Sequence, residues 1–268
     1  MANTELKNFE KTFTESEYGQ TLGANIRYGK YKPEEMTNEA WVELLGRDVS
    51  NLQHLSLTRG IATAFVRHST EHQPELLTAD EGQMLELTAQ VHDWGEALTG
   101  DISYGDKNAD DDEIEKDAFE IVASRLYADE PEKLEQLKQA RDIALTHEGG
   151  KLNEIFFAIE CLGYFRTALR ASELALDESL PEALRARLVW LTTDVISNVS
   201  IKMLAFAEKY KAIEAAVAAN SEVAEQAFEL IAIHDDTVYG NYGERALEKR
   251  QAVSTARNAW HAYAAPLF

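Results

Sequence analysis

The sequence is poor in several features, and each shortage excludes a class of protein. It has a single cysteine, Cys161, which excludes an internal disulfide framework and fits a reducing, cytoplasmic environment. It has only five prolines and no Ser/Gly-rich stretch, which argues against a long disordered linker. No run of about 18 apolar residues occurs, so we expect no membrane span. No basic and apolar segment near Met1 resembles a signal peptide.

Positive charge is also scarce. The 26 basic residues stand against 47 acidic ones, the formal net charge is −21, and Lys and Arg are scattered along the chain. Such a surface repels nucleic-acid backbones, so we expect no nucleic-acid partner. A small phosphorylated substrate remains compatible with this charge, because a metal ion and a few placed cations can override the global field locally.

The chain is rich in helical periodicity. Apolar residues recur at helical spacing from Trp41 onward, and neither β-type alternation nor an internal repeat is present in the sequence. We therefore predict an all-α fold. The predicted helices begin near Thr37, carry Leu55–Val66 and Met84–Val91, and continue over about 111–128, 131–146, 152–176, 181–210, 211–219, 221–234 and 244–262.

Three segments are predicted along the chain. Residues 1–37 are polar with scattered aromatics and glycines, and we expect an irregular N-terminal arm packed on the body. Residues 38–180 form the helical core that carries the candidate chemistry. Residues 181–268 form a C-terminal helical extension of the same domain.

One His-Asp pair stands out among the seven histidines. Asp93 follows His92 directly, and Glu96 and Asp101 come shortly after. On a helix, His92 and Glu96 lie on one face, and the glycines of this stretch favour a helix end there. The dipeptide alone is a moderate signal, because it occurs by chance in many proteins.

The surrounding pattern is more specific. From residue 92 to residue 101 the chain reads HDWGEALTGD. This segment resembles the H-D-x-x-E-x-x-T-G-D pattern of the HD superfamily of metal-dependent phosphohydrolases, in the branch of the bacterial 5′-deoxynucleotidases. The resemblance covers roughly residues 40–175. It implies an HD-domain helical bundle, here with extra C-terminal helices, in which His92 and Asp93 bind a metal ion.

The family also has an upstream histidine ligand, in a segment like N-V-x-E-H-S. Residues 49–56, VSNLQHLS, are similar to that segment, which assigns the first ligand to His54. His68 and His72 are the alternative, because two histidines at i and i+4 on a helix can themselves hold a metal. Their surroundings are polar, which favours His54.

The fourth ligand of the family is an aspartate on a later helix, and here the chain departs from the pattern. Glu160 stands where the family has Asp. A glutamate is a valid ligand, but its extra methylene shifts the ion or the helix and leaves the identity of the metal open. The alternative is a partly buried carboxylate paired with Arg166 or Arg170.

Cations for the phosphate are the next candidates. Arg47 falls near the arginines that relatives use on phosphate, and Lys107 is a second candidate substrate-binding residue. The stretch after Lys107 is equally typical of a solvated acidic helix start. A second dipeptide, His234-Asp235, lacks the Glu and T-G-D tail, so we interpret it as structural.

The resemblance implies a hydrolytic mechanism. A mixed N/O site suits Mn, Fe, Co, Ni, Zn or Mg, and such an ion would polarise a phosphoryl oxygen and activate a bound water. Glu96 would protonate the leaving oxygen or orient the water, and Asp101 would align the water or the substrate sugar. We expect a 5′-nucleotidase acting on (deoxy)nucleoside monophosphates. The alternatives are a (deoxy)nucleoside triphosphate triphosphohydrolase and a non-catalytic HD scaffold that serves as a binding module. A homodimer is compatible with this, since family members often pair.

Overall fold

The computed structural model describes residues 3–46, 49–100, 109–145 and 150–264. Within these ranges the chain folds into helices, without strands, and an isolated antiparallel bridge joins Ile26 to Ser50. The prediction of an all-α fold is therefore confirmed. The chain divides into two compact units, one made of Met1–Tyr28 and Asn38–Ile159 and the other of Gly29–Thr37 and Glu160–Phe268.

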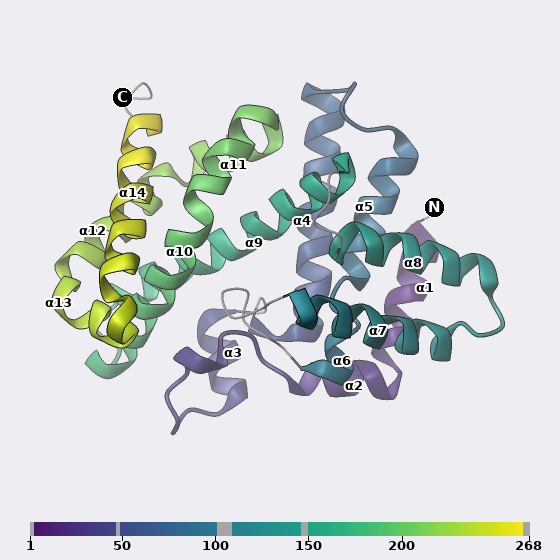
Figure 1. Ribbon diagram of the computed structural model, residues 1–268, viewed down its shortest axis with the longest axis horizontal. Helices are drawn as coiled ribbons and strands as arrows, with labels where there is room; N and C mark the ends of the chain where they lie inside the picture. Colours follow the sequence, from purple (N-terminus) through teal and green to yellow (C-terminus); the bar gives the residue numbers. More distant parts are fainter. Residues whose placement is uncertain (1–2, 47–48, 101–108, 146–149, 265–268) are drawn as a thin grey trace. The chain divides into compact units, whose positions relative to one another are not determined.

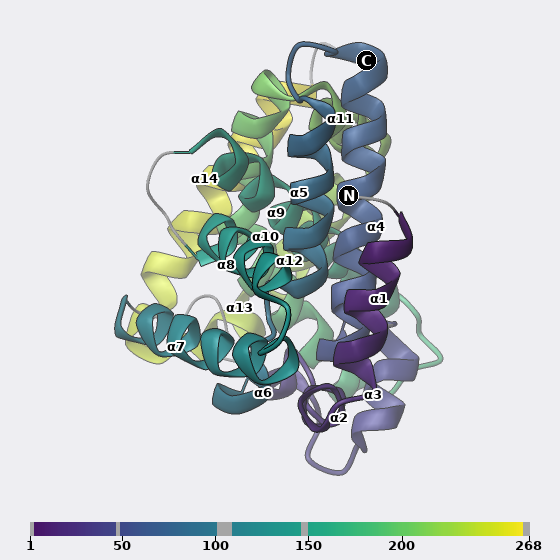
Figure 2. The same ribbon diagram turned by 90° about the vertical axis from the view of Figure 1, so that its right-hand side faces the viewer.

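The first unit is built on a helical hairpin. α4 (Asn51–His72) and α5 (Ala79–Val91) run antiparallel side by side, joined by a short loop (Figures 1 and 2). α8 (Pro131–Leu145) packs on α5, and α7 (Ala109–Leu126) packs on α8 and on the short α6 (Glu96–Thr99). The other helices of this unit are α1 (Asn3–Thr14), α2 (Glu17–Ala24), α3 (Asn38–Leu45) and the first part of α9 (Lys151–Ala175).

Local sequence explains how the hairpin closes. Thr78 and Glu81 form a capping box, in which each side chain accepts a hydrogen bond from the backbone N–H of the other, and α5 begins there. Gly82, four residues after Thr78, lies against Val66 of α4. A Cβ at Gly82 would come within 2.8 Å of Cγ1 of Val66, so the glycine permits the close approach of the two helices.

The N-terminal segment differs from the prediction. It forms α1 and α2 rather than an irregular arm, because Leu6, Phe9 and Phe13 fall on one face of a helix and are fully buried. Ser16 then accepts a hydrogen bond from the backbone N–H of Gly19 and caps α2. The expected irregular structure is wrong for the two helical stretches of this segment, α1 and α2, and Phe9 and Phe13 belong to the core.

A stack of aromatic rings fixes the turn that follows α5. Trp94 is fully buried, with its ring centroid 4.5 Å from Phe13 and nearly parallel to it. Phe119 of α7 lies 6.0 Å away at an interplanar angle of 20°. Offset stacking of this kind adds about 0.5–1.5 kcal/mol per pair to the area that the rings bury. The residue that follows the His-Asp pair is thus an anchor of the core.

The second unit is arranged around one long helix, α10 (Glu182–Lys209), and α14 (Ala246–Ala264) packs against it. The remaining elements of this unit are η1 (Gly29–Tyr31), the second part of α9, α11 (Lys211–Ala219), α12 (Ser221–Ile233), α13 (Asp235–Val238) and η3 (Tyr239–Arg245). α10 is long and apolar enough to cross a membrane by length and composition, and 61% of its most apolar window is buried in the structure. A buried core helix passes the same test, so this is weak evidence for a span.

An ionic cluster ties the short segment 29–37 to these helices. Asp194 of α10 lies 2.7 Å from Nζ of Lys249 and 3.2 Å from Nζ of Lys30, and it accepts a hydrogen bond from the hydroxyl of Tyr31. The division between the two compact units falls inside α9, an uninterrupted helix that leaves no loop signal in the sequence. The segment boundaries at 37 and 180 stay predictions.

Candidate metal centre

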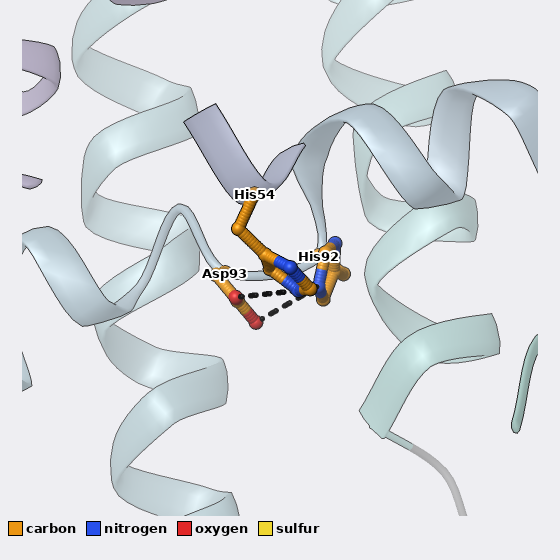
Figure 3. A group of neighbouring side chains, drawn as sticks. All are labelled: His54, His92 and Asp93. Carbon is orange, nitrogen blue, oxygen red and sulfur yellow. Dashed lines mark hydrogen bonds and ion pairs between the residues drawn. The ribbon is translucent and has the colours of Figure 1, made fainter. Parts of the chain in front are cut away.

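The hairpin brings three predicted ligands together. His54 lies on α4, while His92 caps the C-terminus of α5 and Asp93 follows it. All three are buried, with 6%, 2% and 9% of their surfaces exposed. Figure 3 shows both imidazole rings and the carboxylate pointing toward one another. Their ligand atoms lie within 4.8 Å of one another, so the group could hold a metal ion.

The spacing of these atoms matches one coordination sphere. Nε2 of His92 lies 3.3 Å from Nε2 of His54 and 3.2 Å from Oδ1 of Asp93, and Nε2 of His54 lies 3.8 Å from Oδ2 of Asp93. Two nitrogen ligands at a tetrahedral ion with Zn–N bonds near 2.05 Å are separated by about 3.3 Å. The three atoms therefore need little movement to share an ion.

The position of the ring proton on His92 also favours a cation between His92 and Asp93. Its Nδ1 lies 3.1 Å from the carbonyl oxygen of Ala89, which can only accept, so we assign the ring proton to Nδ1. The neutral ring then presents the lone pair of Nε2 to the carboxylate of Asp93. Two acceptors at this distance require a cation between them, either a proton or a metal ion. A backbone acceptor on the far nitrogen is also the usual support of a metal-ligating histidine.

His54 is held in the form that binds metal. Burial lowers the pKa of His54 well below its ordinary value, and the positive charge of Arg27 lowers it further, although Asp93 opposes the shift. The neutral imidazole is the ligand form. The hydroxyl of Thr58, one turn along α4, lies 3.3 Å from Nδ1 and 3.2 Å from Nε2 of the ring and can accept from whichever nitrogen carries the proton.

Asp93 is held as a carboxylate. Burial would raise its pKa, but a proton shared with His92, and after it the neighbouring His54 and the positive charge of Arg27, outweigh burial and lower the pKa of Asp93 below its usual range. An ionised aspartate beside two imidazoles is a donor set for borderline divalent ions such as Mn, Fe, Co, Ni and Zn.

A second group of carboxylates shares Asp93. Glu96 and Glu115 are both buried, and their oxygens lie within 4.8 Å of each other and of Asp93. Nδ2 of Asn51 donates a 2.8 Å hydrogen bond to Oε2 of Glu96. Gly95 permits this arrangement, because a Cβ there would lie 2.6 Å from the backbone oxygen of Glu115. Three close carboxylates require cations or protons, so this group also favours a positively charged occupant.

A cavity of about 340 Å³ opens beside these carboxylates. Its lining combines acidic and apolar side chains. The lining residues are Glu96, Leu98, Thr99, Gly100, Asp111, Ile114 and Glu115.

The other predicted site residues are not brought together here. Arg47, Asp101 and Lys107 lie outside the described residues. Glu160 is half-buried on α9, is the first α9 residue of the second unit, and is absent from both groups of ligand atoms, so its role as the fourth ligand stays a prediction. His234 caps α13 in the second unit.

Sequence reasoning missed three residues of this centre. Arg27 is buried, and its charge acts on both His54 and Asp93. It is held near the start of α4 because its N–H donates to the carbonyl of Val49, next to the bridge between Ile26 and Ser50. No local pattern signals such a pairing between distant segments.

The other two residues, Asn51 and Glu115, could have been found from the sequence pattern. Asn51 lies three residues before His54 on the same face of α4. Glu115 lies on the apolar face of α7, in line with Phe119 and Val122, which are fully buried. A polar side chain on the buried face of a helix needs a partner, and this points to a site.

No protein-family model matches the chain, and no curated protein or solved structure matches it. The resemblance to the HD superfamily therefore rests on the sequence of residues 49–56 and 92–101.

Proposed function

We propose that this chain is a metal-dependent phosphohydrolase of the HD type that releases phosphate from (deoxy)nucleoside monophosphates. The observation that carries the proposal is the buried group of His54, His92 and Asp93, whose ligand atoms have the spacing of one coordination sphere. The sequence HDWGEALTGD supports the choice of family, because two of these ligands and Glu96 occupy its fixed positions.

The side chains around the ligands suit hydrolysis of a phosphate ester. When bound, a divalent ion supplies Lewis acidity toward a phosphoryl oxygen and activates water near neutral pH. Glu96 stands next to Asp93 and is oriented by Asn51, as a group that moves a proton must be. Arg27 is a buried cation, and its guanidinium can bind two phosphate oxygens at once.

The cavity beside Glu96 suits the other end of a nucleotide. Its carboxylates accept hydrogen bonds from sugar hydroxyls or base amines, and Leu98 and Ile114 offer apolar surface. The same acidic lining disfavours additional phosphates. This favours a nucleoside monophosphate over a triphosphate.

The test is a comparison of metal loading and products. The chain is stripped with chelator, reloaded with Mn²⁺ or Co²⁺, and assayed on a panel of nucleoside mono- and triphosphates. We expect metal-dependent release of inorganic phosphate from monophosphates. Release of tripolyphosphate from triphosphates would favour the triphosphohydrolase. Inactivity of the loaded protein on the whole panel would favour the non-catalytic scaffold.

The chain offers a matched control for the site. His92→Ala and His234→Ala each remove the histidine of a His-Asp dipeptide, one in the buried group and one at the start of α13. We expect His92→Ala to lose activity and the buried ion while keeping its helix content by circular dichroism. His234→Ala should keep both activity and metal. Equal activity of the two variants would refute the assignment of the centre.

A further inference from the structure

A second pair of histidines lies on α4, away from the buried centre. His68 and His72 are one turn apart in the last part of the helix, and their ring centroids are 4.2 Å apart with the planes inclined by 48°. Residues at i and i+4 share a helix face. The pair is separated from His54 by 14 residues of helix, or about 21 Å at 1.5 Å per residue. It therefore cannot contribute to the same ion.

We infer that His68 and His72 form a peripheral site for a divalent transition-metal ion of the Ni²⁺, Cu²⁺ or Zn²⁺ class, independent of the proposed hydrolytic centre. Nitrogen ligands of a tetrahedral Zn²⁺ are about 3.3 Å apart, and rings with centroids 4.2 Å apart reach such a separation by small rotations about their side-chain bonds. The spacing is that of the paired histidines in helical zinc motifs.

Two further observations favour a cation here. Oε2 of Glu71 lies 3.9 Å from Nε2 of His72, so a carboxylate stands beside one of the two imidazoles. The pair also lies at the C-terminal end of α4, where the backbone carbonyls of the last turn create a negative potential. Both effects attract a positive ion and repel an anion.

Exposure determines what such a site can do. The side chains of His72 and Glu71 are 54% and 60% exposed, so water completes the coordination and the ion exchanges with solvent. The side chains of His54, His92 and Asp93 are far less exposed, so an ion bound there exchanges more slowly. We therefore expect two classes of ion in the full chain, an exposed one that chelator removes quickly and a buried one that it removes slowly.

The proposal is tested by titrating the chelator-stripped full chain with Ni²⁺ in a calorimeter. The wild type and the variants His68→Gln, His72→Gln and His92→Ala are compared. His68→Gln and His72→Gln should each lose the exposed binding phase and keep the buried one, whereas His92→Ala should do the reverse. His261→Gln is the matched control, because His261 is another exposed histidine on a helix, with a side-chain exposure of 45%.

A spectroscopic readout separates a built site from scattered binding. Cu²⁺ bound to the His92→Ala protein should show two coupled nitrogen ligands by electron paramagnetic resonance, and the added variant His68→Gln should remove one of them. Affinity should follow the order Cu²⁺ above Ni²⁺. The proposal is overturned if His68→Gln and His72→Gln bind Ni²⁺ with the stoichiometry and affinity of the His261→Gln control, since the ions would then sit on scattered surface groups.

Discussion

Replacement of Gly95 by alanine tests how closely α7 must approach the His-Asp turn. A Cβ at this position would lie 2.6 Å from the backbone oxygen of Glu115, 3.1 Å from its Cγ and 3.2 Å from the backbone nitrogen of Phe119. The two backbone atoms belong to α7 and cannot move without the helix. Gly95 itself has helical dihedrals, so alanine brings no strain of its own.

Two opposing effects determine the change in the free energy of unfolding. Overpacking of this kind costs about 1–3 kcal/mol, while loss of glycine's freedom in the unfolded chain returns about 0.4–1 kcal/mol. We expect Gly95→Ala to lower the free energy of unfolding by about 1–2 kcal/mol. Gly60 is the control, since it is exposed within α4 and nothing lies within 4 Å of an added Cβ. Gly60→Ala should stabilise the chain by about 0.5–1 kcal/mol.

Urea unfolding of the two variants measures the difference. The midpoint should fall for Gly95→Ala and rise for Gly60→Ala, with the slope unchanged in both. Because displacement of α7 also moves Glu115 relative to Asp93, metal affinity should fall in Gly95→Ala and stay unchanged in Gly60→Ala. If the two variants had the same midpoint, the close approach of α7 to the turn would be disproved.

Three further outcomes are expected. Trp94→Ala removes the ring between Phe13 and Phe119 and should cost about 3–5 kcal/mol in urea unfolding, and Trp94→Phe clearly less; equal losses would contradict the stacking argument. Gly100 has a φ of +80° and a ψ of 168°, a region that only glycine adopts readily, so Gly100→Ala should cost about 1–3 kcal/mol through backbone strain alone, and an unchanged midpoint would argue against that conformation. Burial raises the pKa of Asp194, but hydrogen bonds from a buried lysine and a tyrosine and nearby positive charges outweigh it and hold the pKa below its ordinary value. The stabilisation is therefore present above the unfolded-state pKa of about 3.9 and is lost as pH falls through the lower folded pKa. Asp194→Asn should flatten that acid limb of the stability profile, and an unaltered limb would place its origin elsewhere.

The helices could be predicted because their apolar residues repeat with the helical period. The stretch predicted as 152–176 is α9, Lys151–Ala175, and the one predicted as 221–234 is α12, Ser221–Ile233. The N-terminal helices escaped prediction because they are short and carry few apolar residues, although Leu6, Phe9 and Phe13 share one helix face. Periodicity reports burial against a neighbour, and a short helix carries few periods.

The candidate centre also contains residues that could be predicted from the sequence and one that could not. His92, Asp93 and Glu96 are close in sequence, so their proximity could be predicted from the turn that holds them. His54 was assigned by resemblance alone, since 38 residues separate it from His92. Arg27 could not be predicted, because its burial depends on a pairing between segments that no local pattern specifies.

The path of the chain through the second unit has a consequence for the order of assembly. The hydroxyl of Tyr31 meets Asp194, 163 residues later in the chain, and Lys249 of α14 joins the same carboxylate. A chain is synthesised from its N-terminus, so segment 29–37 leaves the ribosome long before its partners exist. Its native contacts with Asp194 can form only after α10 and α14 have been made. The second unit therefore closes late in biosynthesis: a nascent chain that ends at residue 193 already contains all of the first unit, but segment 29–37 still lacks Asp194 and α14.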